Sequence, residues 1–421
     1  MLDIKFIREN ADLIKAGAKK KRLDVDIDRL LAVDAKRKEL MTAVESARAR
    51  QNQASQEIPS ATAERKESLL SEMKVLKEEM SKKEQELQEI EKEWQLLMVS
   101  VPNVPDPSVP DGDSDADNQE VRAWGKKPQF DFVPKSHVEL MQELGMADFE
   151  RGTKVAGFRG YFLKNDGALL NFAVWRYAQD FFLKKGLSPM LVPSLVRRVN
   201  FLGTGYIPQG EDDLYKTQDS DFLAGTAEVA TMGYHMGDVL DAKELPLKYL
   251  SFSPCFRREA GSHSKDVKGL IRVHEFFKWE QVLLCEATHE ESVKWHEWLN
   301  RNTEEFIESL GIPYHTVINC GGDLGLGQVK KYDIELWVPG ENTYREISSA
   351  SYFHDFQTRR LNIRYRDAEG KMQYAHSLNS TAVPTPRILV SLVENYQQAD
   401  GSIKIPEALH SYLGKEVIKK G

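Results

Sequence analysis

Apolar residues in the first quarter of the chain recur at alternating spacings of four and three, a pattern typical of helices that pack along one seam. One such run covers residues 33–58 and another covers residues 69–97. The segment Pro59-Ser60-Ala61-Thr62 between them is suited to a turn. The pattern therefore predicts two long helices in an antiparallel hairpin, a coiled-coil arm that buries only its own seam. Taken alone, such an arm most often serves as a dimerisation or spacer element.

The pattern changes near residue 100. Residues 102–112 are rich in proline and cannot continue a helix, so we place a linker there. Helical spacing over residues 168–185 is followed by a short strand that ends at Pro193. We predict three parts, namely an N-terminal domain with the arm at residues 1–101, the linker at residues 102–112, and a larger domain at residues 113–421.

The stretch from Pro254 to Gln281 concentrates groups that can hold a nucleotide. Arg257 and Glu259 are two residues apart, so on an extended strand both side chains would point to one face. A guanidinium there can hold a phosphate by paired hydrogen bonds, and a carboxylate can accept from a purine amino group. Residues 261–269 predict a loop, and alternation over residues 271–281 predicts a second strand. One face of that strand carries His274, Phe276, Lys278 and Glu280.

Composition limits the classes of function. The chain has 421 residues, 41% of them hydrophobic, which is enough for one large core and a smaller module. A net charge of -8 argues against a general nucleic-acid coat protein, so any RNA contact is expected to be local. Three isolated cysteines predict neither a disulfide framework nor a thiolate zinc site. A charged N-terminus and the lack of a long apolar run predict a cytoplasmic protein without a membrane partner.

Several segments together resemble the seryl-tRNA synthetases, a family of class II aminoacyl-tRNA synthetases. FRREAG and GLIRVHEFFKWEQ, within residues 256–281, are similar to motif 2 of that family, and residues 376–409 are similar to motif 3. Residues 344–366 resemble its metal and ATP segment, and MLDIKFIRENADLI resembles its usual opening. The resemblance covers nearly all of the chain. It implies an α+β fold, with a class II antiparallel sheet flanked by helices and an N-terminal antiparallel coiled-coil hairpin.

The resemblance also assigns site residues by position. The catalytic residues are Arg257 and Arg387. The residues expected to bind L-serine are Thr226, Ala227, Glu228, Arg257, Glu280, Asn379 and Thr381. The residues expected to bind ATP are Arg257, Arg258, Glu259, Val273, Phe276, Glu346, Ile347, Ser348, Ser349 and Arg387. The expected ligands of Mg²⁺ are Glu346 and Ser349.

The chemistry of these side chains suits the assignments. Thr226 and Glu228 offer a hydroxyl and a carboxylate for an ammonium group. A buried carboxylate at Glu280 that faces the serine hydroxyl would reject alanine by about 1–3 kcal/mol, because the lost hydrogen bond leaves a desolvated charge. Glu346 and Ser349 are oxygen ligands, which a hard divalent ion prefers.

The resemblance implies activation of L-serine by ATP and transfer of the seryl group to tRNA(Ser), and it leaves tRNA(Sec) open. In this family the arm contacts the tRNA, whereas residues 168–193 form motif 1 and build a homodimer. An ordinary core helix and strand would show the same motif 1 pattern. Two other functions stay open at this point, a catalytically silent synthetase paralogue and an amino acid:carrier-protein ligase. A basic cluster at residues 19–22 could meet phosphates, although a short solvated charge run would look identical.

Two segments depart from the pattern of the family. Between Asn379 and Arg387 the chain has Ser380 through Pro386 where the common bacterial form is rich in glycine, and its two prolines remove two amide donors. If any part of the site is altered, we expect it here. In the motif 2 loop, residues 262–265 and Lys268 stand where arginines are common, which predicts weaker contacts with phosphates or the tRNA acceptor stem.

Overall fold

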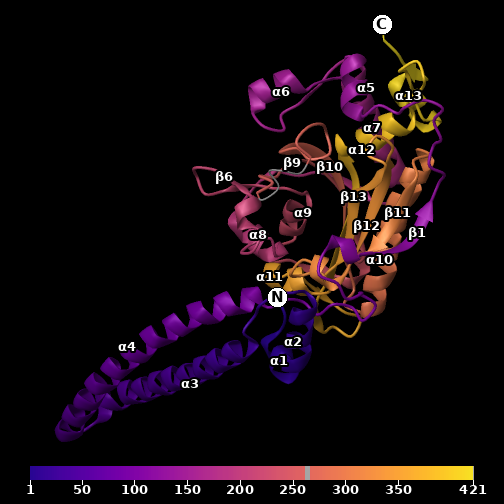
Figure 1. Ribbon diagram of the computed structural model, residues 1–421. Helices are drawn as coiled ribbons and strands as arrows, with labels where there is room; N and C mark the ends of the chain where they lie inside the picture. The colour runs from indigo at the N-terminus through magenta and orange to yellow at the C-terminus, as the bar shows by residue number, and fades with distance from the viewer. Residues whose placement is uncertain (261–265, 421) are drawn as a thin grey trace. The chain divides into compact units, whose positions relative to one another are not determined.

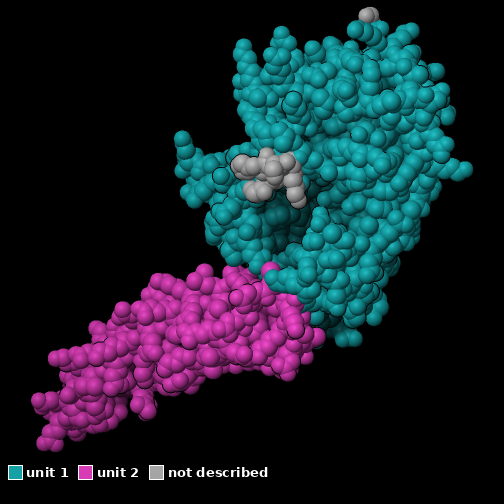
Figure 2. Space-filling model, in the orientation of Figure 1, with its two compact units in different colours: residues 1, 20–22, 103–421 teal, residues 2–19, 23–102 magenta. Residues whose placement is uncertain are grey.

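The computed structural model describes residues 1–260 and 266–420. The chain forms two compact units, which Figure 2 shows in different colours. Residues 1, 20–22 and 103–421 form the large unit, and residues 2–19 and 23–102 form the helical unit. The predicted motif 2 loop residues 262–265 lie outside the described residues.

The helical unit is built around two long helices, α3 (Ile27–Glu57) and α4 (Ala63–Ser100), preceded by the short helices α1 (Ile4–Glu9) and α2 (Ala11–Lys20). The helices α3 and α4 lie side by side (Figure 1), joined by the 3-10 turn Ile58–Ser60. The Thr62 hydroxyl caps α4 by accepting from the backbone N–H of Arg65. The structure therefore confirms the predicted helical hairpin and its turn.

Ion pairs and one buried carboxylate link α3 to α4. Arg48 and Glu84 approach to 2.7 Å, and Arg29 and Glu93 approach to 2.6 Å. The Asp34 carboxylate is almost fully buried and accepts from the indole N–H of Trp94 at 3.2 Å. These contacts fix which residues of the two helices face each other.

The large unit contains an eight-stranded sheet, and the order of its strands is β1-β11-β12-β13-β16-β10-β9-β4. All neighbours are antiparallel except β4 and β9. The strands are β1 (Gln119–Trp124), β4 (Ser188–Leu191), β9 (Leu247–Phe256), β10 (Glu275–Cys285), β11 (Tyr314–Ile318), β12 (Lys330–Val338), β13 (Thr343–Tyr352) and β16 (His376–Thr385). The expectation of an antiparallel sheet flanked by helices is confirmed.

Helices and smaller strands complete the large unit (Figure 1). The helices are α5 (His137–Glu143), α6 (Phe149–Ala156), α7 (Asp166–Lys184), α8 (Arg198–Thr204), α9 (Glu228–Tyr234), α10 (His289–Ser309), α11 (Phe356–Leu361), α12 (Arg387–Asn395) and α13 (Glu407–Leu413). The small strands are β2 (Ala147–Asp148), β3 (Phe162–Leu163), β5 (Leu195–Val196), β6 (Tyr215–Lys216), β7 (Phe222–Leu223), β8 (Val239–Asp241), β14 (Arg364–Arg366), β15 (Met372–Tyr374), β17 (Ile403–Lys404) and β18 (Val417–Ile418). Among the described residues, no helix has the length and apolar character needed to cross a lipid bilayer.

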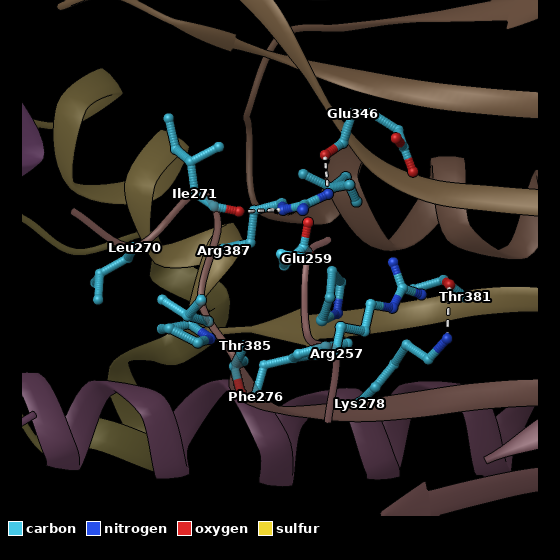
Figure 3. A pocket seen from close by; sticks show the side chains of 14 residues that line it. Arg257, Glu259, Leu270, Ile271, Phe276, Lys278, Glu346, Thr381, Thr385 and Arg387 are labelled. Carbon is cyan, nitrogen blue, oxygen red and sulfur yellow. Dashed lines mark hydrogen bonds between the residues drawn. The ribbon is translucent and has the colours of Figure 1, made fainter. Parts of the chain in front are cut away.

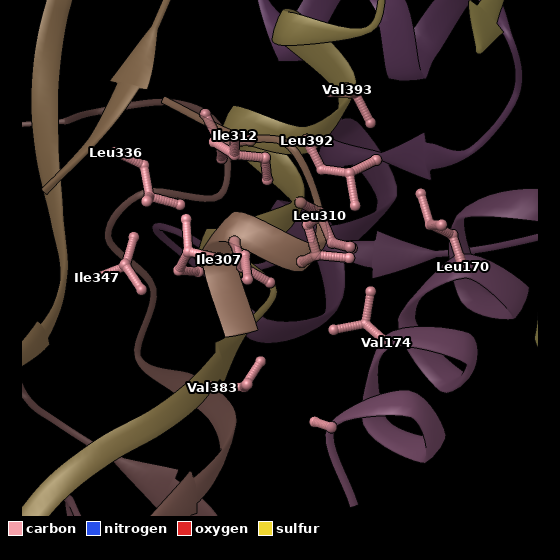
Figure 4. Packing of buried hydrophobic residues seen from close by; sticks show 14 of the residues in the cluster. Leu170, Val174, Ile307, Leu310, Ile312, Leu336, Ile347, Val383, Leu392 and Val393 are labelled. Carbon is pink, nitrogen blue, oxygen red and sulfur yellow. The ribbon is translucent and has the colours of Figure 1, made fainter. Parts of the chain in front are cut away.

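The main core lies between the sheet and the helices α7, α10 and α12 (Figure 4). Burial of this apolar surface is the main stabilising contribution, at about 25 cal/mol per Å² removed from water. The residues labelled in Figure 4 are Leu170, Val174, Ile307, Leu310, Ile312, Leu336, Ile347, Val383, Leu392 and Val393. The helix predicted at residues 168–185 is α7, and the strand predicted after it is β4, which ends two residues before Pro193.

The predicted strand geometry of motif 2 is wrong in two places. Strand β9 ends at Phe256, so Arg257 and Glu259 lie beyond it, and Glu259 has a left-handed backbone with φ of 54°. Strand β10 begins at Glu275 rather than at Ile271. An ion pair of 2.5 Å between Glu259 and Arg272 stabilises the irregular segments. Arg257 and Glu259 therefore reach the same cavity from a turn and not from one strand face.

Candidate active site

A cavity of about 490 Å³ lies over the middle of the large sheet, beside the start of α12 (Figure 3). Its walls combine apolar side chains with cations and carboxylates. The lining residues are Arg257, Glu259, Leu270, Ile271, Val273, Phe276, Lys278, Glu346, Ile347, Thr381, Pro384, Thr385, Pro386 and Arg387. We call it the first cavity. Walls of this kind suit a flat ring with an anionic end.

A second cavity of about 1040 Å³ adjoins the first, and the two share Arg257, Lys278, Glu346 and Thr381. Its walls are more polar and include the start of α9. The lining residues used below are Tyr206, Thr226, Glu228, Glu280, Gly325, Leu326, Gly327, Gln328, Lys331, Ser349 and Asn379. One ligand can therefore extend from one cavity into the other past the four shared side chains.

The guanidinium of Arg387 is held in place by backbone carbonyls. Arg387 is the first residue of α12, where its Nε donates to the carbonyl of Ile271 at 2.8 Å. Its Nη1 donates to the carbonyl of Glu346 at 3.0 Å. Burial lowers the pKa of Arg387, yet an arginine stays charged near neutral pH. A guanidinium has five N–H donors, so this side chain can also bind an anion in the first cavity.

Arg257 stands where the two cavities meet. Its backbone N–H donates to the carbonyl of His274 at 2.9 Å, which extends the pairing of β9 with β10 by one residue. The guanidinium carbon lies 5.4 Å from the ring centre of Phe276. Gly225 lies against this side chain, because a Cβ at residue 225 would be 3.1 Å from Cγ of Arg257. The position places one cation within reach of groups bound in either cavity.

Lys278 forms a buried network in the wall between the cavities. Its ammonium donates to the Thr226 hydroxyl at 3.0 Å, forms an ion pair with the Glu280 carboxylate, and lies 3.5 Å from the Thr381 hydroxyl. The side chains of Lys278 and Glu280 are almost fully buried. Separating the two buried charges would leave each of them unpaired, which is costly. The pair therefore stays together and holds the Thr226 and Thr381 hydroxyls beside it. Lys278 is a polar side chain that the sequence analysis did not assign to the site.

Glu228 begins α9 and forms the far wall of the second cavity. It accepts a hydrogen bond from the Tyr206 hydroxyl at 2.9 Å and another from the Gln357 amide at 2.6 Å. Burial raises the pKa of the Glu228 carboxyl to about 7, the nearby Glu280 carboxylate adds to this rise, and the bond from Gln357 opposes it. The group therefore titrates near neutral pH, and a bound cation would favour its ionised form.

A β-bulge brings Glu346 and Ser349 to one face of β13. On the partner strand Ile334 faces Ser348 and Glu335 faces Glu346, so Ile347 is an extra residue. The Ser349 hydroxyl lies 3.3 Å from the Glu346 carboxylate as a result. Without the bulge, a spacing of three would place these side chains on opposite faces.

A buried carboxylate lies behind this pair. Asp333 is directly opposite Ser349 on β12, and burial raises the pKa of the Asp333 carboxyl. Its Oδ2 accepts from the Asn319 amide at 2.6 Å and lies 3.4 Å from the Lys331 ammonium, whereas its Oδ1 has no hydrogen-bond partner within the described structure. Carboxylate and hydroxyl oxygens gathered in this way are the ligands that a hard divalent cation prefers. Neither Lys331 nor Asp333 has a signal in the sequence beyond alternation with apolar neighbours.

The structure gathers most of the expected site residues around the two cavities, and three lie elsewhere. Arg258 is exposed, and its guanidinium donates to the carbonyl of Asp212 at 2.9 Å. Ala227 is buried at the start of α9, where its carbonyl accepts from the Thr231 hydroxyl. The Ser348 hydroxyl points into the sheet and donates to the carbonyl of Thr381 at 2.6 Å.

The proline-containing part of motif 3 forms regular structure. Residues 380–385 belong to β16 and are buried, and Pro384 faces Lys278 on β10. Ala382 is an extra residue in β16, since Thr381 faces Glu280 and Val383 faces Trp279. Both prolines of this segment line the first cavity, so they contribute apolar walls to it.

Three comparisons with known proteins agree with this arrangement. Residues 1–105 match the family model for the seryl-tRNA synthetase N-terminal domain, and residues 214–396 match the model for the class II tRNA synthetase core domain of the G, H, P, S and T enzymes. A serine–tRNA ligase of Deinococcus radiodurans is 46% identical over 99% of each chain. Another, of Thermodesulfovibrio yellowstonii, is 43% identical over the whole of both chains.

A solved structure of a seryl-tRNA synthetase is similar to this chain over its full length. The seryl-tRNA synthetase of Pyrococcus horikoshii, solved in complex with ATP, superposes with a TM-score of 0.93 at 39% identity and covers 100% of both chains. Full-length similarity at this identity, together with the N-terminal family model, fixes the family as well as the fold. This chain therefore belongs to the seryl-tRNA synthetase family of class II aminoacyl-tRNA synthetases.

Proposed function

We propose that this protein is a serine–tRNA ligase, which activates L-serine with ATP and transfers the seryl group to the 3' end of tRNA(Ser). The observation that carries the proposal is the pair of adjoining cavities with Arg257 between them. One cavity suits a nucleotide and the other suits a small zwitterion, and the reaction needs both reactants at one junction. We propose residues 113–421 as the catalytic domain and residues 1–101 as the domain that binds tRNA.

In the second cavity, Glu228 accepts from the ammonium of serine and Glu280 accepts from its hydroxyl. The Lys278 ammonium pairs with the Glu280 carboxylate and fixes its position, and Thr226, Asn379 and Thr381 supply further polar contacts. Alanine lacks the hydroxyl that Glu280 requires, so its binding leaves a buried carboxylate with one partner fewer. We expect threonine to be excluded by the shape of this cavity.

In the first cavity, adenine lies on Phe276, and Val273 and Ile347 provide apolar contacts. A serine carboxylate oxygen forms a bond to the α-phosphorus while the bond to the pyrophosphate oxygen breaks, giving seryl-adenylate and pyrophosphate. Arg257 contacts both the attacking carboxylate and the α-phosphate, and Arg387 pairs with the departing pyrophosphate. A ribose hydroxyl of the tRNA then attacks the carbonyl and releases AMP. Positioning and charge neutralisation account for the rate, so no protein nucleophile is needed.

We propose Glu346 and Ser349 as the protein ligands of Mg²⁺. Within residues 1–260 and 266–420 there is no group of three or more His, Cys, Asp or Glu side chains that could hold a metal. Phosphate oxygens and water would complete the coordination, as is usual for this ion. When bound, the ion neutralises charge on the phosphates.

The affinity for serine is predicted to depend on pH through Glu228. Its carboxyl has a pKa raised to about 7, so below pH 7 the proton must leave before the ammonium of serine can bind. We expect the KM for serine to be about fivefold higher at pH 6 than at pH 7 and to change less than about twofold between pH 7 and pH 8. Pyrophosphate exchange from pH 6 to pH 9 measures this, with the KM for ATP as the internal control. A serine KM that stays constant across this range in the wild type contradicts the role of Glu228.

Charging assays test the function as a whole. Purified protein with ATP, magnesium and total tRNA is expected to attach serine and to leave alanine and threonine unattached. Serine activation without transfer to tRNA, together with transfer to a carrier protein, would favour an amino acid:carrier-protein ligase. A protein that forms no adenylate with any of the three amino acids would be a silent paralogue. Including tRNA(Sec) as a purified acceptor decides whether it is a second substrate.

We also propose that α7 and β4 form a homodimer interface. Large apolar side chains are exposed on and beside these elements, and exposed apolar patches of this kind mark protein interfaces. They are Phe158, Phe162, Leu169, Phe172 and Leu191. Leu191 is the most exposed of them, at 82%. A second copy of this chain would cover the patch.

The variant Phe172→Glu is expected to be monomeric, because it places a charge in the proposed interface. Light scattering after size exclusion should give twice the 48.0 kDa of one chain for the wild type and 48.0 kDa for the variant. The matched control is Leu70→Glu, which changes an exposed leucine of α4. A monomeric wild type, or a variant that remains dimeric, argues against the interface.

A further inference from the structure

The loop from Gly325 to Gln328 forms part of the wall of the second cavity and is absent from the wall of the first. The cavity that we assign to serine therefore depends on the shape of this loop. The loop is a tight turn, in which the backbone N–H of Gln328 donates to the carbonyl of Gly325 at 3.2 Å and the Gln328 side-chain oxygen accepts from the backbone N–H of Gly325 at 2.6 Å. Contacts from other segments fix where this turn lies. Each of its four carbonyl oxygens accepts a hydrogen bond from one of two residues far away in the sequence, Lys21 and Asn103.

Lys21 supplies three of these bonds. Its ammonium donates to the carbonyls of Gly325 and Leu326 at 3.0 Å each and to the carbonyl of Gln328 at 2.5 Å. An ammonium has three donors, and all three are used. The side chain is only 2% exposed, so it cannot contact a tRNA phosphate as the basic cluster at residues 19–22 had suggested. Burial lowers the pKa of Lys21, and the three carbonyl acceptors favour its charged form.

Asn103 supplies the fourth bond. Its amide donates to the carbonyl of Gly327 at 3.1 Å and to that of Phe353 at 2.7 Å, and its backbone N–H donates to the carbonyl of Leu326 at 2.9 Å. Gly327 also packs against aromatic rings, because a Cβ at residue 327 would lie 2.7 Å from the ring of Phe356. The loop is thus held on several sides at once.

The neighbours of Lys21 are anchored as well. A Cβ at Gly321 would lie 2.3 Å from the carbonyl oxygen of Lys20, so the two backbones are in close contact. Arg22 has a left-handed backbone, with φ of 57°, and forms an ion pair with Asp113. The segment from Lys20 to Arg22 belongs to the large unit although it connects α2 with α3. Its position is therefore fixed independently of the loop that it holds.

We propose that Lys21 is a positioning residue for the serine site, holding the loop from Gly325 to Gln328 in the shape that serine binding requires, with Asn103 as its second anchor. In the chain, Lys21 separates α2 from α3, and Asn103 follows α4. Both anchors are therefore points at which the chain enters or leaves the helical unit. The inference rests on the proposed function, because it uses the assignment of the second cavity to serine.

The test is a comparison of kinetic constants in the full-length enzyme. Lys21→Met removes the three donors and keeps most of the side-chain volume. We expect the KM for serine in pyrophosphate exchange to rise about tenfold or more, because three hydrogen bonds of a charged group are lost. The KM for ATP and the kcat should change less than about threefold, since the loop does not line the first cavity. Lys21→Arg, which retains a cation with several donors, should restore part of the serine KM.

Lys19→Met is the matched control, since Lys19 is exposed two residues earlier, and it should leave both KM values unchanged. Hydrogen–deuterium exchange supplies a readout independent of turnover. In Lys21→Met, exchange of peptides that cover residues 325–328 should increase, while exchange in β10 and β16 should not. If Lys21→Met fails to fold, Asn103→Ala takes its place, with a smaller rise expected in the serine KM alone.

The outcomes separate this inference from the proposed function. A wild-type protein without serine-dependent pyrophosphate exchange overturns the function itself. An active wild type with an unchanged serine KM in Lys21→Met overturns the positioning role. Equal rises in the KM for serine and for ATP also overturn it, because they indicate a general structural effect.

Discussion

Replacing Arg257 with alanine is expected to reduce serine-dependent pyrophosphate exchange by about 10²–10³-fold, because one preorganised cation at the reacting phosphate is lost. Arg257 is the only arginine among the residues that line both cavities of the described structure. Neither Lys278, paired with Glu280, nor Arg387, bound to two carbonyls, can move to its place without breaking those contacts. The kcat should fall more than the affinity for either substrate, since the bond to be stabilised forms only in the transition state.

Arg151→Ala is the matched control for this variant. Arg151 is a surface arginine that pairs with Asp148 at 2.8 Å, and its removal should leave exchange unchanged. Thermal unfolding of both variants should stay within a few degrees of the wild type, because neither side chain belongs to the main apolar core. Exchange that persists in Arg257→Ala at the wild-type rate would exclude the proposed role.

Shortening the helical hairpin is expected to separate the two steps of the reaction. Arg48 and Glu84 face each other across α3 and α4, so residues 49–83 can be replaced by a short Gly-Ser turn that joins these two positions. The remaining pairs, Arg29 with Glu93 and Asp34 with Trp94, lie on the retained part and should keep it folded. Pyrophosphate exchange should remain within about threefold of the wild type, whereas kcat/KM for tRNA charging should fall by about 10²-fold or more.

A second variant controls for damage to the ion pair at the new junction. Arg48→Ala breaks the ion pair at the new junction without shortening the hairpin, and we expect it to charge tRNA almost normally, since exposed pairs contribute little. Equal losses of exchange and charging in the shortened protein would mean that the hairpin supports the fold of the enzyme and not tRNA binding.

Long-range periodicity made the hairpin predictable, whereas the antiparallel sheet was implied by the resemblance to class II synthetases. Heptad spacing repeats over many residues in α3 and α4, so single irregular positions do not hide it. The helix of motif 1 was predicted to within two residues at its start for the same reason. Most of the site residues that motif similarity identified line the two cavities, and local patterns alone could not have identified them.

The parts that were missed depend on contacts between distant segments. Arg257 and Glu259 were expected on one strand face, but Glu259 has a left-handed backbone and its side chain pairs with Arg272, which is 13 residues further along the chain. Lys21 looked like part of a solvated basic cluster, because nothing in residues 19–22 shows that three carbonyls of another loop surround it. Lys278 likewise has no sequence signal that separates a buried ammonium from an exposed one.

The extra residue in β13 has a consequence for how this enzyme can vary. The extra residue Ile347 brings Glu346 and Ser349 to the same side of the strand. The number of residues between them therefore matters more than which apolar residue stands at position 347. Another apolar side chain at position 347 would keep the core filled and the two oxygen groups together. Loss of a single codon there would turn the carboxylate to the opposite surface of the sheet and leave every other residue of the strand chemically intact. A comparison that scores substitutions alone would overlook this constraint, whereas one that scores insertions and deletions would find the segment invariant in length.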